Sequence, residues 1–212
     1  MMDLAMRFDG VITSEEQLLA VLGSPLPHAL KKEITALDAH CREFIARSMF
    51  LVVSSSDAAG RMDVSPKGDP EGFVLVLDDH TLAIPDRPGN RRADTFRNVL
   101  QNPRVGLLFL LPGKGETLRV SGRAAVVRDW ALREQMAVNA KTPELAMVVS
   151  VEQVYFHCAK CVIRSRLWEK HSWPDITGLA SHASCLIEHA KLEDSVAEVQ
   201  ANIERSYRSQ LY

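Results

Sequence analysis

The chain has 212 residues, of which 46% are hydrophobic and 25% are charged, and its formal net charge is -2. This composition is typical of a globular protein with one core, and the small net charge argues against a broad surface for nucleic acid or for an anionic membrane. No apolar run reaches the length of a membrane span, and residues 1–10 lack the basic and apolar regions of a signal peptide, so we expect a cytoplasmic protein.

Two helices are expected before the first strand. Thr13 and Glu16 have the spacing of a capping box, so the first helix begins there and ends at Gly23-Ser24-Pro25. The second is expected from Pro27 to about Arg47, because apolar residues recur along it at helical spacing. Cys41 falls on that apolar face, where a small buried hydrophobe is expected rather than a reactive thiol. The four cysteines of the chain are too few for a disulfide framework and are expected to be reduced.

From Met49 the pattern changes to short β-prone runs joined by turns. Strands are expected at Met49 to Ser54, Met62 to Ser65, Phe73 to Leu77, Thr81 to Ile84, Val105 to Leu111, Glu116 to Arg128 and Ala146 to His157. We expect Pro66 to break the pairing of the second strand. Helices are expected at Arg91 to Gln101, at Trp130 to Ala140 with Asp129 as N-cap, and within about Ile176 to Tyr207. This order predicts an α+β fold with a mainly β core, an antiparallel sheet or small barrel rather than βαβ units.

Three polar, mostly basic clusters lie along these apolar runs or at their ends. They are Arg61 to Asp69, Ile84 to Arg92 and Leu118 to Arg123. Ser65 and Lys67 bracket a proline, while Arg91 and Arg92 stand where a helix is expected to begin. A phosphate monoester binds to cations, hydroxyls and free backbone amides, which a helix start also supplies. The clusters therefore predict one phosphate held between neighbouring strands and a helix start.

The third cluster alternates along its strand. Arg119 and Ser121 share one face with Arg123, whereas the apolar residues of the strand share the other face. Such a polar face is usually solvated. Convergence with the other two clusters favours a binding role instead.

The segment His157 to Trp168 gathers several residues that could carry chemistry. His157, Cys158 and Cys161 have ligand-like spacing, and His171 is near enough in sequence to be a fourth ligand. A structural zinc site usually adds a second Cys-x-x-Cys or a His pair at defined spacing, and neither is present, so no metal site is expected. A redox Cys-x-x-Cys is not expected either, because no thioredoxin-like βαβ unit precedes it.

Four motifs follow one another in a recognisable order. They are Arg-Met-Asp-Val-Ser-Pro-Lys-Gly at 61–68, Ile-Pro-Asp-Arg-Pro-Gly-Asn-Arg-Arg at 84–92, Leu-Arg-Val-Ser-Gly-Arg at 118–123 and His-Cys-x-Lys-x-x-x-Arg-Ser-x-Leu-Trp at 157–168. Together they resemble the pyridoxamine-phosphate-oxidase-like flavin-binding proteins, and most closely a bacterial subgroup of FMN-dependent enzymes. The resemblance implies an antiparallel split β-barrel with flanking helices and a helical C-terminal extension. One domain over 1–212 is expected, with its core at about 49–168 and helical elaborations at 13–47 and 176–207.

The resemblance also implies a homodimer with FMN in clefts between the subunits. The residues implied to line the isoalloxazine ring are Met62, Asp63, Val64 and Ser65. Those implied to hold the phosphate or ribityl chain are Lys67, Arg91 and Arg92, with Ile84, Pro85 and Asn90 beside them. The candidates from the partner subunit to complete the pocket are Arg119, Ser121, Arg164 and Trp168.

The expected activity is that of an FMN-dependent oxidoreductase acting on a small molecule by hydride transfer through flavin N5. His157 and Arg164 are the candidate catalytic residues, although a strand-end histidine satisfied by the backbone is an equal alternative for His157. Arg164-Ser165-Arg166 lacks the His of the ending of true pyridoxamine-phosphate oxidases, which argues against vitamin B6 oxidation. Two other functions remain open, a non-catalytic flavin carrier or sensor and a haem-binding or haem-degrading relative with His171 or His182 as axial ligand.

Overall fold

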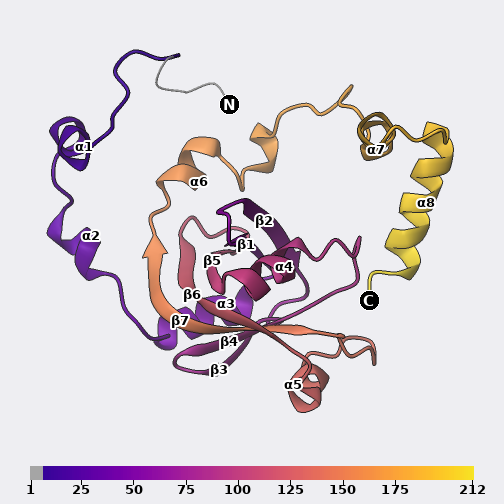
Figure 1. The fold of residues 1–212 in the computed structure, drawn as a ribbon, viewed down its shortest axis with the longest axis horizontal. Helices are drawn as coiled ribbons and strands as arrows, with labels where there is room; N and C mark the ends of the chain where they lie inside the picture. The colour runs from indigo at the N-terminus through magenta and orange to yellow at the C-terminus, as the bar shows by residue number, and fades with distance from the viewer. Residues whose placement is uncertain (1–6) are drawn as a thin grey trace. The chain divides into compact units, whose positions relative to one another are not determined.

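The structure is a computed structural model that describes residues 7–212. Its contacts divide the chain into an N-terminal unit that ends at Glu33 and a main unit from Ile34 to Tyr212 (Figure 1). The expected organisation of residues 1–212 as one domain stays a prediction. The expectation about a signal peptide lies partly outside the described residues. Within 7–212, no helix combines the length and the apolar character needed to cross a bilayer.

The N-terminal unit contains two short helices, α1 (Glu15–Leu22) and α2 (Pro27–Lys31), and neither has a buried residue. The predicted N-cap is displaced by one residue, and the predicted capping box of Thr13 and Glu16 is not formed. Ser14, not Thr13, is the N-cap of α1, and its hydroxyl accepts a hydrogen bond from the N–H of Gln17 at 3.2 Å. The side chain of Gln17 in turn accepts from the N–H of Thr13 at 2.9 Å.

The single helix predicted from Pro27 to Arg47 is wrong. The chain leaves the helical conformation after α2, and Ile34 forms an isolated antiparallel bridge with Val154. A new helix, α3 (Ala39–Arg47), then begins after Asp38, whose carboxylate accepts from the N–H of Cys41 at 2.8 Å. Periodicity alone does not reveal the break, because the apolar spacing continues across it. Asp38 was the available signal, since aspartate is a favoured N-cap.

The main unit is built on one seven-stranded antiparallel sheet in the order β2-β1-β5-β6-β7-β4-β3. The strands are β1 (Phe50–Ser56), β2 (Met62–Gly68), β3 (Leu75–Asp78), β4 (Thr81–Pro85), β5 (Arg104–Leu110), β6 (Thr117–Val127) and β7 (Ala146–His157). The sheet curls around α3 and α4 (Asp94–Gln101) without closing, since its edge strands β2 and β3 do not pair (Figure 1). This is the split-barrel α+β fold that was predicted, and all seven predicted strands are present.

The core lies on one face of this sheet. Leu51 of β1, Phe109 of β5 and Leu118 of β6 are fully buried, together with Ile45 of α3. Burial alternates along β1, β5 and β6, as expected for strands with one face packed on a core. The other face of these strands is covered only in part by the described chain.

Pro66 does not break the β1–β2 pairing, contrary to the prediction. It lies opposite Val52, and the pairing continues to Gly68. β2 is an edge strand, so one of its sides has no neighbouring strand. A proline is tolerated there because its missing N–H need not take part in a ladder.

The helices that follow differ from the prediction, because those at 91–101 and 130–140 are shorter, that at about 176–207 is divided into two, and those at 160–165 and 170–172 were not predicted. They are α4 (Asp94–Gln101), α5 (Trp130–Gln135), α6 (Lys160–Ser165), η2 (Lys170–Ser172), α7 (His182–Ala190) and α8 (Val196–Ser209). Asp129 caps α5 as predicted, accepting from the N–H of Leu132 at 2.8 Å. The backbone is left-handed at Asn139 and Ala140, so α5 cannot extend to Ala140.

Candidate functional site

A pocket of about 1440 Å³ lies beside β2. Its lining comes from four stretches of the chain, at 63–67, 86–96, 141–144 and 203–212, together with His182. The first two belong to the first two basic clusters of the sequence. Pockets for drug-sized ligands occupy about 300 to 1,000 Å³, so this one has room for such a ligand and a second molecule.

Two of the cations in this pocket have no ion-pair or hydrogen-bond partner within the described chain. Lys67 and Arg91 make neither an ion pair nor a hydrogen bond with residues 7–212, although the Nζ atom of Lys67 lies 5.9 Å from the ring centre of Phe96. Arg92, in contrast, donates from Nε to Asp94 at 2.6 Å, and its N–H donates to the side chain of Asn90 at 3.0 Å. Lys67 and Arg91 are therefore the cations most available to an anionic ligand.

β2 lines the pocket with five consecutive residues, 63–67, and burial alternates along them. Asp63, Ser65 and Lys67 are half-buried on one side of the strand, whereas Met62 and Val64 are 66% and 64% exposed. The carboxylate of Asp63 accepts from the hydroxyl of Thr95 at 2.8 Å. This contact ties β2 to α4 and fixes the strand that carries Ser65 and Lys67.

The predicted position of Arg91 and Arg92 at a helix start is wrong. α4 begins at Asp94, and the residue before it, Ala93, has a left-handed backbone with φ 55°. Arg91 is also left-handed, with φ 59°. Non-glycine residues rarely adopt this conformation, and it bends the chain away from helical geometry before α4. An anion beside Arg91 and Arg92 would therefore meet the arginine side chains and the loop rather than the first turn of the helix.

Asp86 and Arg87 were missed in the sequence, although both lie inside the second basic cluster. Burial raises the pKa of the Asp86 carboxyl, and the charges of Lys67 and Arg87 offset part of that effect. Arg87 is fixed by Nε, which donates to Asp69 at 2.5 Å, and by Nη2, which donates to the carbonyl of Met136 at 2.8 Å. The pocket thus contains a carboxyl group that binds a proton more readily than an exposed aspartate does.

Ile84 and Pro85 are buried and do not line the pocket. They pair with Met147 and Ala146 of β7. Because they end β4, they fix the start of the loop that carries Asp86 and the three arginines Arg87, Arg91 and Arg92.

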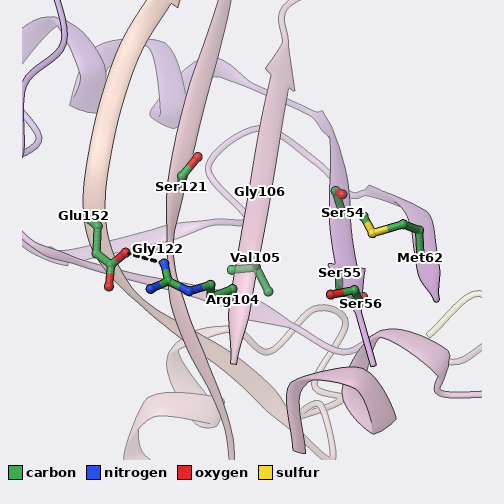
Figure 2. Close-up of a pocket in the computed structure, with 10 residues that line it drawn as sticks. All are labelled: Ser54, Ser55, Ser56, Met62, Arg104, Val105, Gly106, Ser121, Gly122 and Glu152. Carbon is green, nitrogen blue, oxygen red and sulfur yellow. Dashed lines mark hydrogen bonds and ion pairs between the residues drawn. The ribbon is translucent and has the colours of Figure 1, made fainter. Parts of the chain in front are cut away.

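The third cluster lies apart from the pocket within one chain. Arg119 and Ser121 are on β6, which is separated from β2 by β1 and β5, a distance of roughly 14 Å at the usual strand spacing. The expectation that the clusters occupy neighbouring strands is therefore wrong. Ser121 instead lines a hollow of about 290 Å³ on the outer face of the sheet, together with Met62. In this hollow Arg104 reaches across β6 to Glu152 at 3.4 Å (Figure 2).

The remaining predicted residues gather near the end of β7. His157 is half-buried opposite Thr117, and Arg164 is exposed on α6. The indole N–H of Trp168 donates to the carbonyl of Lys114 at 2.8 Å, which fastens the turn between β5 and β6. The guanidinium of Arg119 lies 5.1 Å from the centre of the neighbouring Tyr155 ring. None of these predicted residues lines the large pocket.

Among residues 7–212, no three His, Cys, Asp or Glu side chains are grouped so that they could hold a metal ion. His171 lies 3.1 Å from Arg166 and 3.5 Å from Glu169. Cys158 and Cys161 are exposed free thiols. The histidine and cysteine side chains of the segment after β7 are therefore spread over the surface of the described chain and do not surround a common metal-sized site.

A profile of the family described as pyridoxamine 5'-phosphate oxidase matches residues 37–158, more than half of the chain. The chain belongs to this family. The match covers all seven strands, α3 and α4, so it includes β2 and the loop that line the large pocket. No curated protein matches the sequence.

Several solved structures are similar to this member of the pyridoxamine 5'-phosphate oxidase family. HupZ from Group A Streptococcus is 18% identical with a TM-score of 0.46, over 56% of this chain and 92% of that one. An FMN-binding protein from Syntrophomonas wolfei is 15% identical with a TM-score of 0.42, over 54% and 86%. HutZ, the heme storage protein from Vibrio cholerae, is 15% identical with a TM-score of 0.41, over 57% and 94%.

The pyridoxamine 5'-phosphate oxidase match ends before two parts of the candidate site. Arg164 and Trp168 lie beyond it, and so does the pocket wall at 203–212. The sequence did not reveal this wall, because amphipathic periodicity predicts a helix but not the surface on which its end docks. Tyr207 and Tyr212 were the available signal of docking, because the chain has few aromatic residues and two of them lie in this segment.

Proposed function

We propose that the protein binds FMN in the large pocket and is an FMN-dependent oxidoreductase acting on a small molecule. Membership of the pyridoxamine 5'-phosphate oxidase family supports the proposal. The observation that carries it is the presence of two unpaired cations, Lys67 and Arg91, beside the Ser65 hydroxyl in one pocket. A phosphate monoester has a charge of about -1.5 to -2 near neutral pH and strong acceptor oxygens, which suit these donors.

The donor set of the pocket fits the other parts of FMN as well. β2 is an edge strand, and such a strand offers unpaired N–H and C=O groups to a polar ligand edge. In the proposal, Met62 to Ser65 lie against the isoalloxazine ring, and Lys67, Arg91 and Arg92 hold the phosphate and ribityl chain. Asn90 orders the loop through the N–H of Arg92.

Bound FMN would supply the redox chemistry by accepting hydride at N5. The protein then has to bind the flavin, orient it and keep the loop in place. Ile84 and Pro85 contribute by anchoring β4, and the contact between Asp63 and Thr95 contributes by joining β2 to α4. Asp86 holds a proton near the pocket at a higher pH than an exposed aspartate would.

The functional unit in this proposal is a homodimer formed through the outer face of the sheet. On that face Pro66, Val52, Leu108 and Arg119 lie in one row across β2, β1, β5 and β6. Sheets that pack face to face around a two-fold axis between β1 and β5 bring β6 of one copy opposite β2 of the other. The partner subunit would then complete each pocket with Arg119, Ser121, Arg164 and Trp168, and its His157 and Arg164 are the candidate catalytic residues.

We expect Lys67→Ala combined with Arg91→Ala to weaken FMN binding by well over tenfold. A charge-assisted contact contributes about 1.5 to 3 kcal/mol, and about 1.4 kcal/mol corresponds to a tenfold change in affinity. Titration of the purified protein with FMN, followed by flavin absorbance and fluorescence, measures the dissociation constant. Arg97→Ala is the control, since Arg97 is exposed on α4 and does not line the pocket.

Unchanged affinity in the double variant would remove the phosphate assignment. A protein that ignores FMN but takes up haem, with a Soret band, or a deazaflavin would retain the fold and refute the cofactor. Size exclusion on the same sample tests the dimer.

A further inference from the structure

The C-terminal segment forms one wall of the large pocket. Seven residues between Ile203 and Tyr212, from the end of α8 and the chain that follows it, line the pocket together with β2 and the loop at 86–96. This segment lies outside the part of the chain that matches the family. The wall is therefore formed by residues that the family match does not cover.

Tyr212 attaches this segment to three other parts of the main unit. Its hydroxyl donates to Asp69 at 2.7 Å, just after β2. Its ring centre lies 5.5 Å from the guanidinium carbon of Arg87, just after β4. Its main-chain oxygen accepts from Nζ of Lys141, before β7, at 2.6 Å. One residue thus contacts the chain after β2, the loop after β4 and the stretch at 141–144.

The contact with Asp69 is built into a buried ion pair. The side chain of Asp69 is 1% exposed and that of Arg87 is 16% exposed. One carboxylate oxygen of Asp69 accepts from Arg87 and the other accepts from Tyr212. A buried carboxylate is stable only when its oxygens are hydrogen-bonded. Undocking of Tyr212 would leave one oxygen of Asp69 without its hydrogen bond, which favours the docked position of Tyr212.

The protonation of Tyr212 favours the same arrangement. The hydrogen bond to Asp69 and the adjacent negative charge raise the pKa of the Tyr212 hydroxyl. The hydroxyl therefore stays protonated and remains a donor at neutral pH.

We propose that Tyr212 is a positioning residue that latches the C-terminal segment onto the barrel, where the segment closes the cofactor pocket and slows the exchange of bound FMN. The identity of the ligand rests on the function proposed above. The latch itself rests on the contacts of Tyr212 with Asp69, Arg87 and Lys141. The two parts can therefore be tested separately.

The latch is tested by amide hydrogen exchange in the cofactor-free protein. Tyr212→Ala removes the ring and the hydroxyl, and Tyr212→Phe removes only the hydroxyl. We expect exchange at residues 203–211 to rise on the order of tenfold in the alanine variant and less in the phenylalanine variant, as local opening becomes easier. Tyr207→Phe is the matched control, because Tyr207 lines the same pocket but its hydroxyl makes no hydrogen bond within residues 7–212. Unchanged exchange in Tyr212→Ala overturns the latch.

The closing role is tested by the rate of FMN release, followed by the recovery of flavin fluorescence on dilution. We expect release from Tyr212→Ala to be several-fold faster than from the wild type, with Arg97→Ala, at an exposed residue that does not line the pocket, unchanged. Raised exchange with an unaltered release rate overturns the role of the segment in closing the pocket. If the wild type binds no FMN, the function proposed above is refuted, whereas raised exchange in Tyr212→Ala still supports the latch.

Discussion

Asp86 shows how the position of one carboxyl group changes its pKa. It follows β4 directly, and its N–H donates to the carbonyl of Leu145 at 3.0 Å, so the backbone holds it at the wall of the pocket. Burial disfavours its charged form and raises its pKa, even though Lys67 and Arg87 lie near enough to oppose the shift. The folded protein therefore binds a proton at Asp86 more readily than the unfolded chain does.

This preference predicts a pH dependence of stability. Because the native state binds the extra proton, the contribution of Asp86 to the free energy of unfolding falls as the pH rises above the ordinary value of 3.8 towards the raised pKa. Asp86→Asn removes this dependence, so the stability of the variant relative to the wild type should increase over that range. Urea unfolding at a series of pH values measures the difference. Asp194→Asn, an exposed control, should leave it constant, and a constant difference for Asp86→Asn would contradict the prediction.

Cys41 is a residue whose environment the sequence did predict. It lies on the apolar face of its helix and is 1% exposed, and burial raises the pKa of its thiol to about 12. Helical periodicity sufficed here because it reports on burial directly. The environment of Asp86 could not be found in this way, since it depends on residues from three separate segments.

The pairing of β6 with β7 requires a glycine at one position. The register shifts between Ser121 and Gly122, where β7 contains one extra residue, and such a bulge bends and twists a strand pair. A Cβ atom at Gly122 would lie 2.0 Å from the carbonyl oxygen of Ser150. Only glycine allows the two backbones to approach so closely, and the neighbouring Ser121 is thereby held at the outer hollow (Figure 2).

Gly122→Ala should therefore destabilise the protein by about 2 to 4 kcal/mol, because the clash involves a backbone atom that cannot rotate away. Gly106→Ala is the matched control on the adjacent strand β5. A Cβ atom there would meet only the Cβ of Ser54, at 3.9 Å. Thermal and urea unfolding compare the two variants. Equal stability of both would mean that the strands can separate at this position without cost.

The strands could be predicted from the sequence more reliably than the helix ends. Alternation and turn residues mark each strand locally, and all seven are present. Helix ends depend on side-chain caps and on single left-handed residues. Thus Asp129 was found as the cap of α5, whereas the left-handed backbone at Arg91 and Ala93, which delays α4, has no residue type that marks it.

For the whole molecule, the order of strands decides which clusters can share a ligand. Sequence proximity suggested one site for all three basic clusters, but β1 and β5 lie between β2 and β6. Strand order follows from long-range pairing, which no local pattern encodes. In the dimer proposed above, the two-fold axis would place β6 of one copy opposite β2 of the other. The third cluster of one subunit would then lie near the first cluster of its partner.

Leu108→Asp should convert this dimer to a monomer. Leu108 lies at the middle of the outer face, between Val52 of β1 and Arg119 of β6, and a buried unpaired carboxylate there would oppose association. Sedimentation should give the 23.6 kDa of one chain for the variant and twice that mass for the wild type. Leu100→Asp, at a 79% exposed leucine of α4, should remain dimeric. A Leu108→Asp dimer would move the interface to another surface.

The proline in β2 has a consequence for the behaviour of the protein at high concentration. An open sheet edge is a template on which a strand from another chain can add, the first step towards amyloid-like aggregation. Pro66 lies in the middle of this edge strand and has no N–H to donate, so an incoming strand could not complete a regular ladder along it. The stretch that offers Ser65 and Lys67 to a ligand is thereby protected against polymerisation by the residue between them.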